Sequence, residues 1–365
     1  MKTRVCHVAS NHYVTDARIF KKECKSLSRK YEMYLIVPNT ECRIIDDIHV
    51  VGVNLPEELF KRIFNLNPIY EAALEVNADI YHFHDPELLP IAAKIKRKGK
   101  IVIFDSHEDM PSDILEKPYL PRWSRKLISI VYETYEKRTL RKFDALVTVT
   151  PKIVERLRTI NSNTYLITNY PIFKDIPINE SRSQQICFTG LISHLWNHVP
   201  IVKALEKANV KYVLAGPMTE QYKKELSALK GWEKVDYKGV VPAKEAEKIQ
   251  TESVAGMAIL GYSPVAGGKE GTLGNTKLFE YMMAGTPVIA TDMRLWKEII
   301  DKYQCGICVN PDSDEEIAAA ITKLINSPEL VSSMGKNGKE AVKKEFNWET
   351  QEKTLFEMYD KVLNS

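Results

Sequence analysis

Residues 271–292 read GTLGNTKLFEYMMAGTPVIATD, a stretch that predicts a loop, a short helix, a turn and a buried strand. Asn275 is expected as the N-cap of the helix, because its side-chain oxygen can accept an unpaired N–H of the first turn. Gly285 suits the position after the last helical residue, and residues 288–290 are typical of a buried parallel strand. The inner face of the helix is expected to consist of Leu278, Phe279 and Met282.

Lys277 does not fit a purely structural account of this stretch. It lies in the first turn of the expected helix, where the helix dipole disfavours a cation by roughly 0.3–1 kcal/mol. A glycine loop, unpaired N–H groups and a lysine at one helix start suit a phosphate or diphosphate, so Asn275, Thr276 and Lys277 are candidate ligands. The alternative is an ion pair with Glu280, worth about 0.2–0.5 kcal/mol. Glu280 is also a candidate acceptor for the hydroxyls of a ribose.

Five motifs along the chain occur in an order and spacing that resemble one enzyme family. They are DARIFKKE at 16–23, NTKLFEYM at 275–282, AGTPVI at 284–289, MGKNG at 334–338 and FNWE at 346–349. Together they resemble the signatures of family 4 glycosyltransferases, which are retaining enzymes of GT-B fold. The resemblance covers nearly the whole chain.

The domain organisation follows from length and from this resemblance. At 365 residues the chain is too long for one ordinary core, and a strand–helix alternation restarts in its second half. The resemblance implies an α/β GT-B fold, with two doubly wound Rossmann-like domains facing a cleft. We expect an acceptor-side domain at 1–170, a polar linker at 171–185, a nucleotide-sugar-binding domain at 186–346, and a helix at 347–365 that crosses back onto the N-terminal domain.

Composition indicates a globular protein of the cytoplasm. Apolar residues make up 44% of the chain, charged residues 27%, and the net charge is only +3, which argues against bulk nucleic-acid binding. The six cysteines are scattered, as expected in a reducing compartment, and the Cys305–Cys308 pair is expected to serve packing. No secretory signal is evident, and no apolar run approaches the ~20 residues of a membrane span.

Two strands of the first half, in residues 79–86 and 101–108, are predicted to end in polar side chains. Ligands of doubly wound sheets bind beyond the carboxyl ends of the strands, so His84 and Asp85 are expected to line the cleft. His82 and His84 also have the spacing of metal ligands. No third ligand is evident, so we expect no metal here and interpret His82 as a core histidine.

His107 is the first catalytic candidate. The resemblance implies that a histidine closing this strand faces the donor sugar, where it would hydrogen-bond the sugar or hold a phosphate. Asp105 and Glu108 are expected to orient it or to shape the acceptor pocket. The alternative is a polar cluster that merely caps a loop.

His12 and Arg18 follow the first predicted strand and are further candidates for lining the cleft. Arg18 can contact a phosphate, and the alternative is an exposed arginine on a helix that begins at Asp16.

Residues 117–142 interleave basic side chains with Trp123 and several tyrosines. Such a segment can lie on an anionic bilayer, which would place the enzyme peripherally at the inner face of the cell membrane. The alternative is an ordinary amphipathic helix with a solvated basic face.

The chain departs from the family pattern near the expected donor diphosphate. After the glycine that ends the first strand of the second domain, here Gly190, relatives place an arginine and then a lysine five residues later. This chain has Leu191 and Trp196 at those positions, and His194 is a nearby polar substitute.

A second departure concerns the family's paired glutamates, of which Glu280 is the second. The first position is Thr272, and the nearest acid is Glu270, which is therefore the second catalytic candidate. Gly268 and Lys269 are expected to compensate by contacting phosphate through backbone N–H groups and a cation.

The most favoured function is transfer of a sugar, with retention, from a UDP- or GDP-linked donor to a glycan or lipid-linked glycan, in cell-surface polysaccharide synthesis. We expect no cofactor and no required metal. One alternative is a non-catalytic relative that binds a nucleotide-sugar or a partner, which the two departures favour. Another is a GT-B sugar-nucleotide 2-epimerase, which would need no acceptor.

Overall fold

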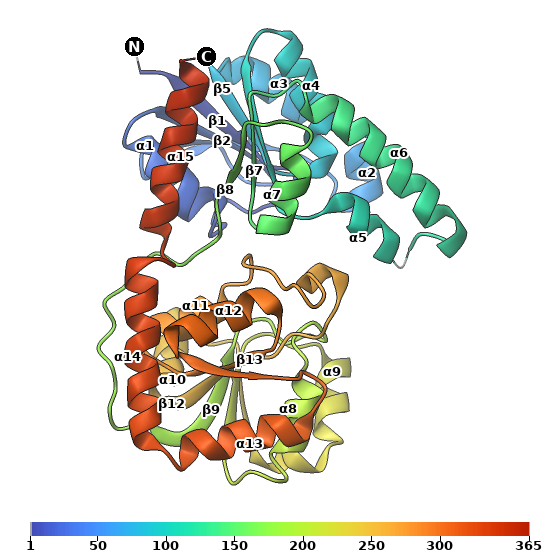
Figure 1. Cartoon of the computed structure of the whole chain (residues 1–365). Coiled ribbons are helices and arrows are strands. Elements are labelled where there is room, and N and C mark those ends of the chain that lie inside the picture. The colour runs from blue at the N-terminus through green and yellow to red at the C-terminus, as the bar shows by residue number, and fades with distance from the viewer. Residues whose placement is uncertain (1, 118, 365) are drawn as a thin grey trace. The chain divides into compact units, whose positions relative to one another are not determined.

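The computed structural model describes residues 2–117 and 119–364, which divide into two compact units. The first unit runs to Asn169 and resumes at Trp348, and the second is Tyr170–Asn347. Each unit is a largely parallel sheet with helices packed on its faces (Figure 1), as the sequence predicts. The segment expected as a linker belongs to the second unit, whose first strand begins at Ser183.

In the sheet of the first unit, the order in which the chain adds strands reverses beside the first strand. Its order is β3-β4-β2-β1-β5-β6-β7-β8, and only β3 is antiparallel to its neighbour. Chain progression therefore reverses between β1 and β5, which is where such sheets bind ligands. The strands are β1 (Arg4–Val8), β2 (Glu32–Pro38), β3 (Arg43–Ile45), β4 (Ile48–Val53), β5 (Ile80–Phe83), β6 (Ile101–Ser106), β7 (Ala145–Thr148) and β8 (Thr164–Leu166).

The two faces of this sheet bury separate apolar clusters. One cluster includes side chains of the C-terminal helix α15 (Trp348–Leu363), so this helix packs on the N-terminal unit as expected. Within the described residues, no helix combines the length and apolar content that a membrane crossing requires. The other helices are η1 (Ile19–Cys24), α1 (Lys25–Ser28), α2 (Leu59–Ile63), α3 (Asn67–Val76), η2 (Pro86–Leu88), α4 (Leu89–Arg97), α5 (Met110–Glu116), α6 (Arg122–Leu140) and α7 (Pro151–Arg158).

The helix expected from Asp16 begins later and with a wider turn. Asp16 Oδ1 accepts the N–H groups of Arg18 and Ile19 at 2.8 Å, and the first helical segment, η1, is a π-helix. Its i→i+5 bond from Glu23 N–H to the Arg18 carbonyl, 3.0 Å, brings these two side chains onto one inward face.

The second unit has the sheet order β11-β10-β9-β12-β13-β14, all parallel, which reverses between β9 and β12. The strands are β9 (Ser183–Thr189), β10 (Lys211–Ala215), β11 (Val235–Gly239), β12 (Ser253–Ala258), β13 (Val288–Thr291) and β14 (Gly306–Val309). The helices are α8 (His198–Ala204), α9 (Glu220–Ser227), η3 (Lys230–Lys234), α10 (Ala243–Glu252), η4 (Pro264–Ala266), α11 (Lys277–Met283), α12 (Arg294–Tyr303), α13 (Asp314–Ile325) and α14 (Pro328–Lys344).

The structure places residues 271–292 largely as predicted. The inner face of α11 is fully buried, Gly285 has φ +67°, and β13 lies between β12 and β14. The expected N-cap at Asn275 is wrong, because the cap residue is Thr276, which makes no side-chain capping bond. The preceding loop closes its own turn, with Thr272 Oγ1 accepting from Gly274 N–H, and so leaves Asn275 outside the helix.

Candidate functional site

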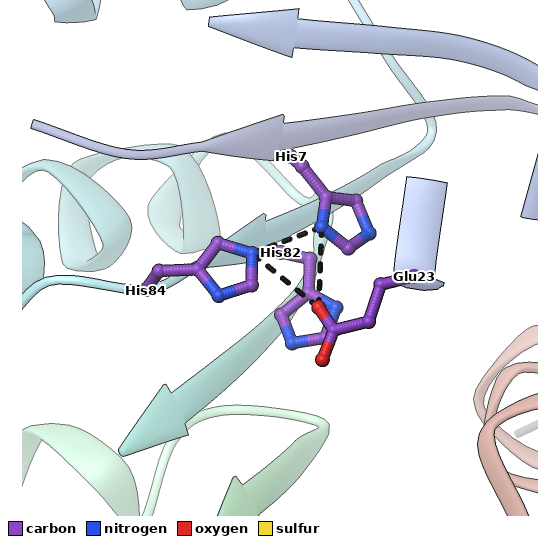
Figure 2. A group of neighbouring side chains, drawn as sticks. All are labelled: His7, Glu23, His82 and His84. Carbon is purple, nitrogen blue, oxygen red and sulfur yellow. Dashed lines mark hydrogen bonds and ion pairs between the residues drawn. The ribbon is translucent and has the colours of Figure 1, made fainter. Parts of the chain in front are cut away.

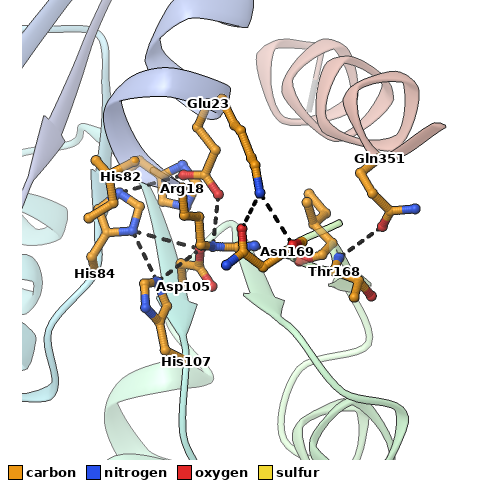
Figure 3. A network of polar contacts seen from close by, with 12 residues as sticks. Arg18, Glu23, His82, His84, Asp105, His107, Thr168, Asn169 and Gln351 are labelled. Carbon is orange, nitrogen blue, oxygen red and sulfur yellow. Dashed lines mark hydrogen bonds and ion pairs between the residues drawn. The ribbon is translucent and has the colours of Figure 1, made fainter. Parts of the chain in front are cut away.

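Most of the predicted site residues of the first unit gather at the carboxyl ends of β1, β5 and β6 (Figure 3). His84 and Asp85 follow β5, while Asp105 lies near the end of β6 and His107 follows it. Because β1 and β5 flank the point where the strand order reverses and β6 lies next to β5, these strand ends meet at the position expected of a ligand site.

Asp105 and Arg18 form a buried ion pair at the centre of this network. The Arg18 guanidinium donates to Asp105 Oδ2 at 2.7 and 3.0 Å and to the Ile167 carbonyl at 2.8 Å. Burial alone would raise the pKa of Asp105, but Arg18 and His107 hold it well below the usual value. Both expectations for Arg18 need correction, because a side chain 5% exposed neither lines an open surface nor stands on a solvated helix face. Asp105, fully buried, is likewise a support and not a lining residue.

His107 is the exposed end of this network. Its Nε2 lies 3.3 Å from Asp105 Oδ2 and 3.4 Å from His84 Nδ1, and the side chain is 24% exposed. The predicted role of Asp105 in orienting His107 therefore agrees with the geometry. Burial lowers the pKa of His84 to about 4, so His84 is a neutral member of the chain of contacts.

His12 and Asp85 form the neighbouring part of the site. His12 contacts Asp16 at 3.1 Å and Asp85 at 3.4 Å; burial opposes its charge, yet these carboxylates raise its pKa to about 10. Asp85 also accepts the backbone N–H groups of Ser10 and Asn11. Burial opposes its charge, but His12 and then the Ser10 N–H lower its pKa to about 2. Asp85 therefore fixes the loop after β1 and presents His12 as a cation beside His107, with the two rings 5.6 Å apart.

Glu108 follows His107 and is exposed. Burial and the neighbouring Asp113 raise its pKa. Its backbone carbonyl accepts from the Ser106 hydroxyl at 3.0 Å, which shapes the loop after β6.

Two residues that the sequence analysis did not select lie beneath this network: His7 and Glu23 (Figure 2). They meet His82 and His84 in a fully buried group. Glu23 lies four residues after the apolar Ile19, a spacing that places both side chains on one helix face and offers a local signal that Glu23 is buried. His7 offers no such signal, since its position depends on the pairing of β1 with β5.

In the second unit, the structure brings Lys277 and Gly190 together. A Cβ on Gly190, whose φ is +148°, would lie 2.8 Å from Lys277 Cε and 3.3 Å from Lys277 Nζ. The lysine side chain thus crosses the backbone at the carboxyl end of β9. Lys277 Nζ also pairs with Glu280 Oε2 at 2.5 Å, and Thr276 donates to Glu280 Oε1 at 2.5 Å. The ion pair considered as the structural alternative is therefore present in this structure.

The loop before α11 holds the other donor-side candidates. Glu270 pairs with Arg294 at the start of α12, with Nε to Oε2 at 2.8 Å. Gly268 has φ +60° and open space where a side chain would begin, and the Lys269 ammonium lies 5.7 Å from the Tyr262 ring centroid. Thr272, at the position of the missing glutamate, accepts the Trp296 indole N–H through its backbone carbonyl.

The residues that replace the expected cations differ in their surroundings. Trp196 is buried against Phe188, with ring centroids 5.2 Å apart, whereas Leu191 is 62% exposed. His194 packs on the Tyr222 ring at 4.0 Å and lies 3.7 Å from Glu225. None of these three supplies the fixed positive charge that relatives place here.

Comparison with known proteins identifies the family. The model of glycosyl transferases group 1 matches residues 173–341, and the model of glycosyltransferase family 4 matches residues 18–169. An uncharacterized glycosyltransferase of Methanocaldococcus jannaschii is 28% identical over 90 residues, which cover 25% of this chain and only 23% of that protein.

Two solved structures resemble the whole chain in fold. A sucrose-phosphate synthase from Thermosynechococcus elongatus has a TM-score of 0.79 at 13% identity, covering 100% of both chains. The Anabaena protein HepE, in complex with UDP and glucose, has a TM-score of 0.72 at 13% identity, covering 98% of this chain and 100% of its own. These matches confirm the predicted GT-B fold.

Proposed function

Because the chain belongs to the glycosyltransferases, through its family 4 and group 1 domains, we propose that it transfers a sugar from a nucleotide diphosphate donor to an acceptor hydroxyl. The observation that carries this proposal is the Lys277 side chain lying across Gly190 at the carboxyl end of β9. That position flanks the reversal of strand order in the second sheet, where doubly wound folds bind ligands. The complex of HepE with UDP and glucose supports a nucleotide donor in this fold.

When the donor binds, the ion pair between Lys277 and Glu280 is replaced by contacts of each side chain with the donor. A diphosphate carries more charge than one carboxylate, so it draws the Lys277 ammonium away from Glu280. The released carboxylate then accepts hydrogen bonds from the ribose hydroxyls. Charge that develops on the diphosphate during transfer is stabilised by a cation already at this position.

The reaction is transfer with retention from a UDP- or GDP-linked sugar. The bond from the anomeric carbon to the diphosphate oxygen breaks, a bond to the acceptor oxygen forms on the same face, and the acceptor proton passes to the leaving phosphate. The chain needs no covalent nucleophile for this step and no resident cofactor. His107, supported by Asp105, hydrogen-bonds the donor sugar, while His12 and Glu108 contribute to the acceptor side.

The acceptor is a glycan or lipid-linked glycan of cell-surface polysaccharide synthesis, used by a cytoplasmic enzyme at the inner face of the membrane. This part of the proposal is supported by α6, whose solvent-facing stripe is apolar: Trp123, Leu127, Ile130 and Val131 are 83%, 61%, 51% and 61% exposed. Its packed face carries the polar side chains Ser124, Ser129, Glu136 and Thr139. An apolar outer stripe flanked by the exposed cations Arg122 and Lys126 suits an anionic bilayer.

The donor proposal is tested by binding of UDP, GDP, ADP and their sugars to the purified full chain, by calorimetry and thermal stability. One diphosphate should bind, and Lys277→Ala and Glu280→Ala should each weaken it at least tenfold, or about 1.4 kcal/mol. The control is Lys297→Ala, which removes an exposed lysine paired with Asp301 elsewhere in the unit. Equal loss in all three variants, or no binding of any nucleotide, would contradict the proposal.

A second candidate is a non-catalytic nucleotide-sugar-binding protein, and the apolar residues Leu191 and Trp196 favour it. Here the donor would bind as above, but no sugar would reach any acceptor. Nucleotide release from the bound donor, measured with and without lipid-linked and soluble glycan acceptors, separates the two candidates.

A further inference from the structure

Four buried side chains direct nitrogen and oxygen atoms toward one point beneath the His107 network (Figure 2). They are His7, Glu23, His82 and His84, and one ligand atom from each lies within 4.8 Å of the others. All four side chains are at most 2% exposed. His82 and His84 have no third ligand near them in the sequence, but β1 and η1 supply two more in the folded chain.

The convergence follows from strand register and from the π-helix. His7 pairs directly with His82 across β1 and β5, and their rings lie 4.5 Å apart. His84 is two residues further along β5, on the same face, with its ring stacked at 4.8 Å on that of His82. The π-turn of η1 then places the Glu23 carboxylate against His7 and His84, at 3.7 and 3.8 Å.

Each imidazole is held through the nitrogen that faces away from the shared point. The Tyr359 hydroxyl of α15 bonds His7 Nε2 and His82 Nδ1, both at 3.0 Å. His84 Nδ1 faces Asp105 Oδ2 at 3.7 Å. This leaves His7 Nδ1 and His84 Nε2 directed at each other and at Glu23. An outer hydrogen bond orients metal-binding histidines in the same way.

Hydrogen bonding alone does not satisfy the inward atoms. His7 Nδ1 and His84 Nε2 lie 2.9 Å apart and can share one proton. His82 Nε2 has no hydrogen-bond partner in residues 2–117 and 119–364, and Glu23 Oε2 has only the longer histidine contacts. Each unsatisfied buried polar atom destabilises the folded chain.

We propose that His7, His82, His84 and Glu23 bind one divalent transition-metal ion, with zinc the first candidate. Zinc takes three imidazoles and a carboxylate in a tetrahedron with bonds of about 2.0–2.2 Å, which sets ligand atoms about 3.3–3.6 Å apart. The measured separations of 2.9, 3.7 and 3.8 Å bracket that range. These separations join His7, His84 and Glu23, and a ligand atom of His82 lies within 4.8 Å of the other three ligand atoms.

The site is structural in kind. Four protein ligands without solvent access leave no open position for a substrate, as in closed zinc sites. The ion joins β1, β5 and η1 directly and α15 through Tyr359. It also fixes His84, whose outer nitrogen contacts His107 at 3.4 Å.

The test uses the full-length chain produced in zinc-depleted medium supplemented with zinc or cobalt, because a buried site loads during folding. About one equivalent of metal should co-purify, and the cobalt form should show the visible d–d bands of tetrahedral Co²⁺. His82→Ala should lose the metal and the bands. His198→Asn, a substitution of a buried histidine in the second unit, should keep both.

Tyr359→Phe provides a milder variant should His82→Ala fail to fold. Losing the hydroxyl that orients His7 and His82 should weaken metal affinity about 10–100-fold in a competition with a chromophoric chelator. A metal-free wild-type protein without the cobalt bands would overturn the proposal. So would metal retained in His82→Ala, or an affinity unchanged in Tyr359→Phe.

Discussion

Gly256 in β12 lies against the ring of Tyr281, a fully buried side chain of the helix that carries Lys277. A Cβ on Gly256 would lie 2.2–2.5 Å from three ring carbons, so Gly256→Ala must displace the ring or the strand. We expect a loss of about 1–3 kcal/mol in unfolding free energy, the usual cost of overpacking a core. Urea unfolding measures it. Gly261→Ala is the matched control, because residues 2–117 and 119–364, apart from its two chain neighbours, place no atom within 4 Å of its added Cβ. Equal losses would contradict the prediction.

His198 predicts a pH dependence of stability in the second unit. It is fully buried with Nδ1 bonded to Tyr212, and burial lowers its pKa to about 3, against about 6.5 when unfolded. Between these values only the unfolded chain binds a proton on this imidazole. The contribution of neutral His198 to the unfolding free energy is therefore complete above about pH 6.5 and is lost as pH falls. His198→Asn should remove about 2 kcal/mol of the stability difference between about pH 7 and pH 5. If the unfolding free energies of the wild type and the variant depend on pH in the same way, this prediction is wrong.

Residue roles were predictable from sequence where they depend on local spacing. Gly285 and the buried face of α11 follow from the 3.6-residue period and from the conformational freedom of glycine. Arg18 was misjudged because its partner Asp105 is 87 residues away and meets it only through packing of η1 on the sheet. His7 was missed for the same reason, since only the register of β1 on β5 reveals it.

At the scale of elements, the strands with continuous apolar runs were predicted to within a few residues, because buried parallel strands need no alternation to be recognised. The short antiparallel edge strand β3 and the π-turn of η1 were not predicted. Both depend on contacts with neighbouring segments and leave no periodic signal of their own.

The helix α6 predicts binding to anionic membranes. Leu127 belongs to the exposed apolar stripe of this helix and lies near the exposed cations Arg122 and Lys126. The stripe inserts into the bilayer while the cations contact lipid phosphates. Leu127→Glu should weaken binding to phosphatidylglycerol vesicles at least about tenfold, since burying a leucine is worth about 1.5–3 kcal/mol. Vesicle co-sedimentation measures this, and binding should also decline as salt is raised.

The matched control is Leu74→Glu on α3, which alters a leucine that is also exposed, at 39%, in the same unit. It should leave vesicle binding unchanged. If both variants bind as the wild type does, α6 is an ordinary solvated helix and the acceptor need not be lipid-linked.

At the scale of the whole chain, the two units have separate cores, and they differ in how the chain builds them. The apolar cluster of the second unit contains only residues 170–346. One cluster of the first unit is completed by five side chains from the far end of the chain: Trp348, Leu355, Met358, Tyr359 and Val362. The family motif FNWE at residues 346–349 therefore marks the point where the chain leaves one core and enters the other.

This difference predicts how fragments behave. A fragment of residues 170–347 should fold alone and unfold cooperatively, because its core is complete. A fragment ending at Asn169 should not, since five buried side chains at about 1.5–3 kcal/mol each amount to roughly the 5–15 kcal/mol by which a domain is stable. Fusing residues 348–365 to that fragment through a glycine–serine linker should restore folding. Amide dispersion in NMR spectra and protease resistance report whether each fragment folds. A folded fragment without α15 would contradict the prediction, because the core of the first unit would then be stable without this helix.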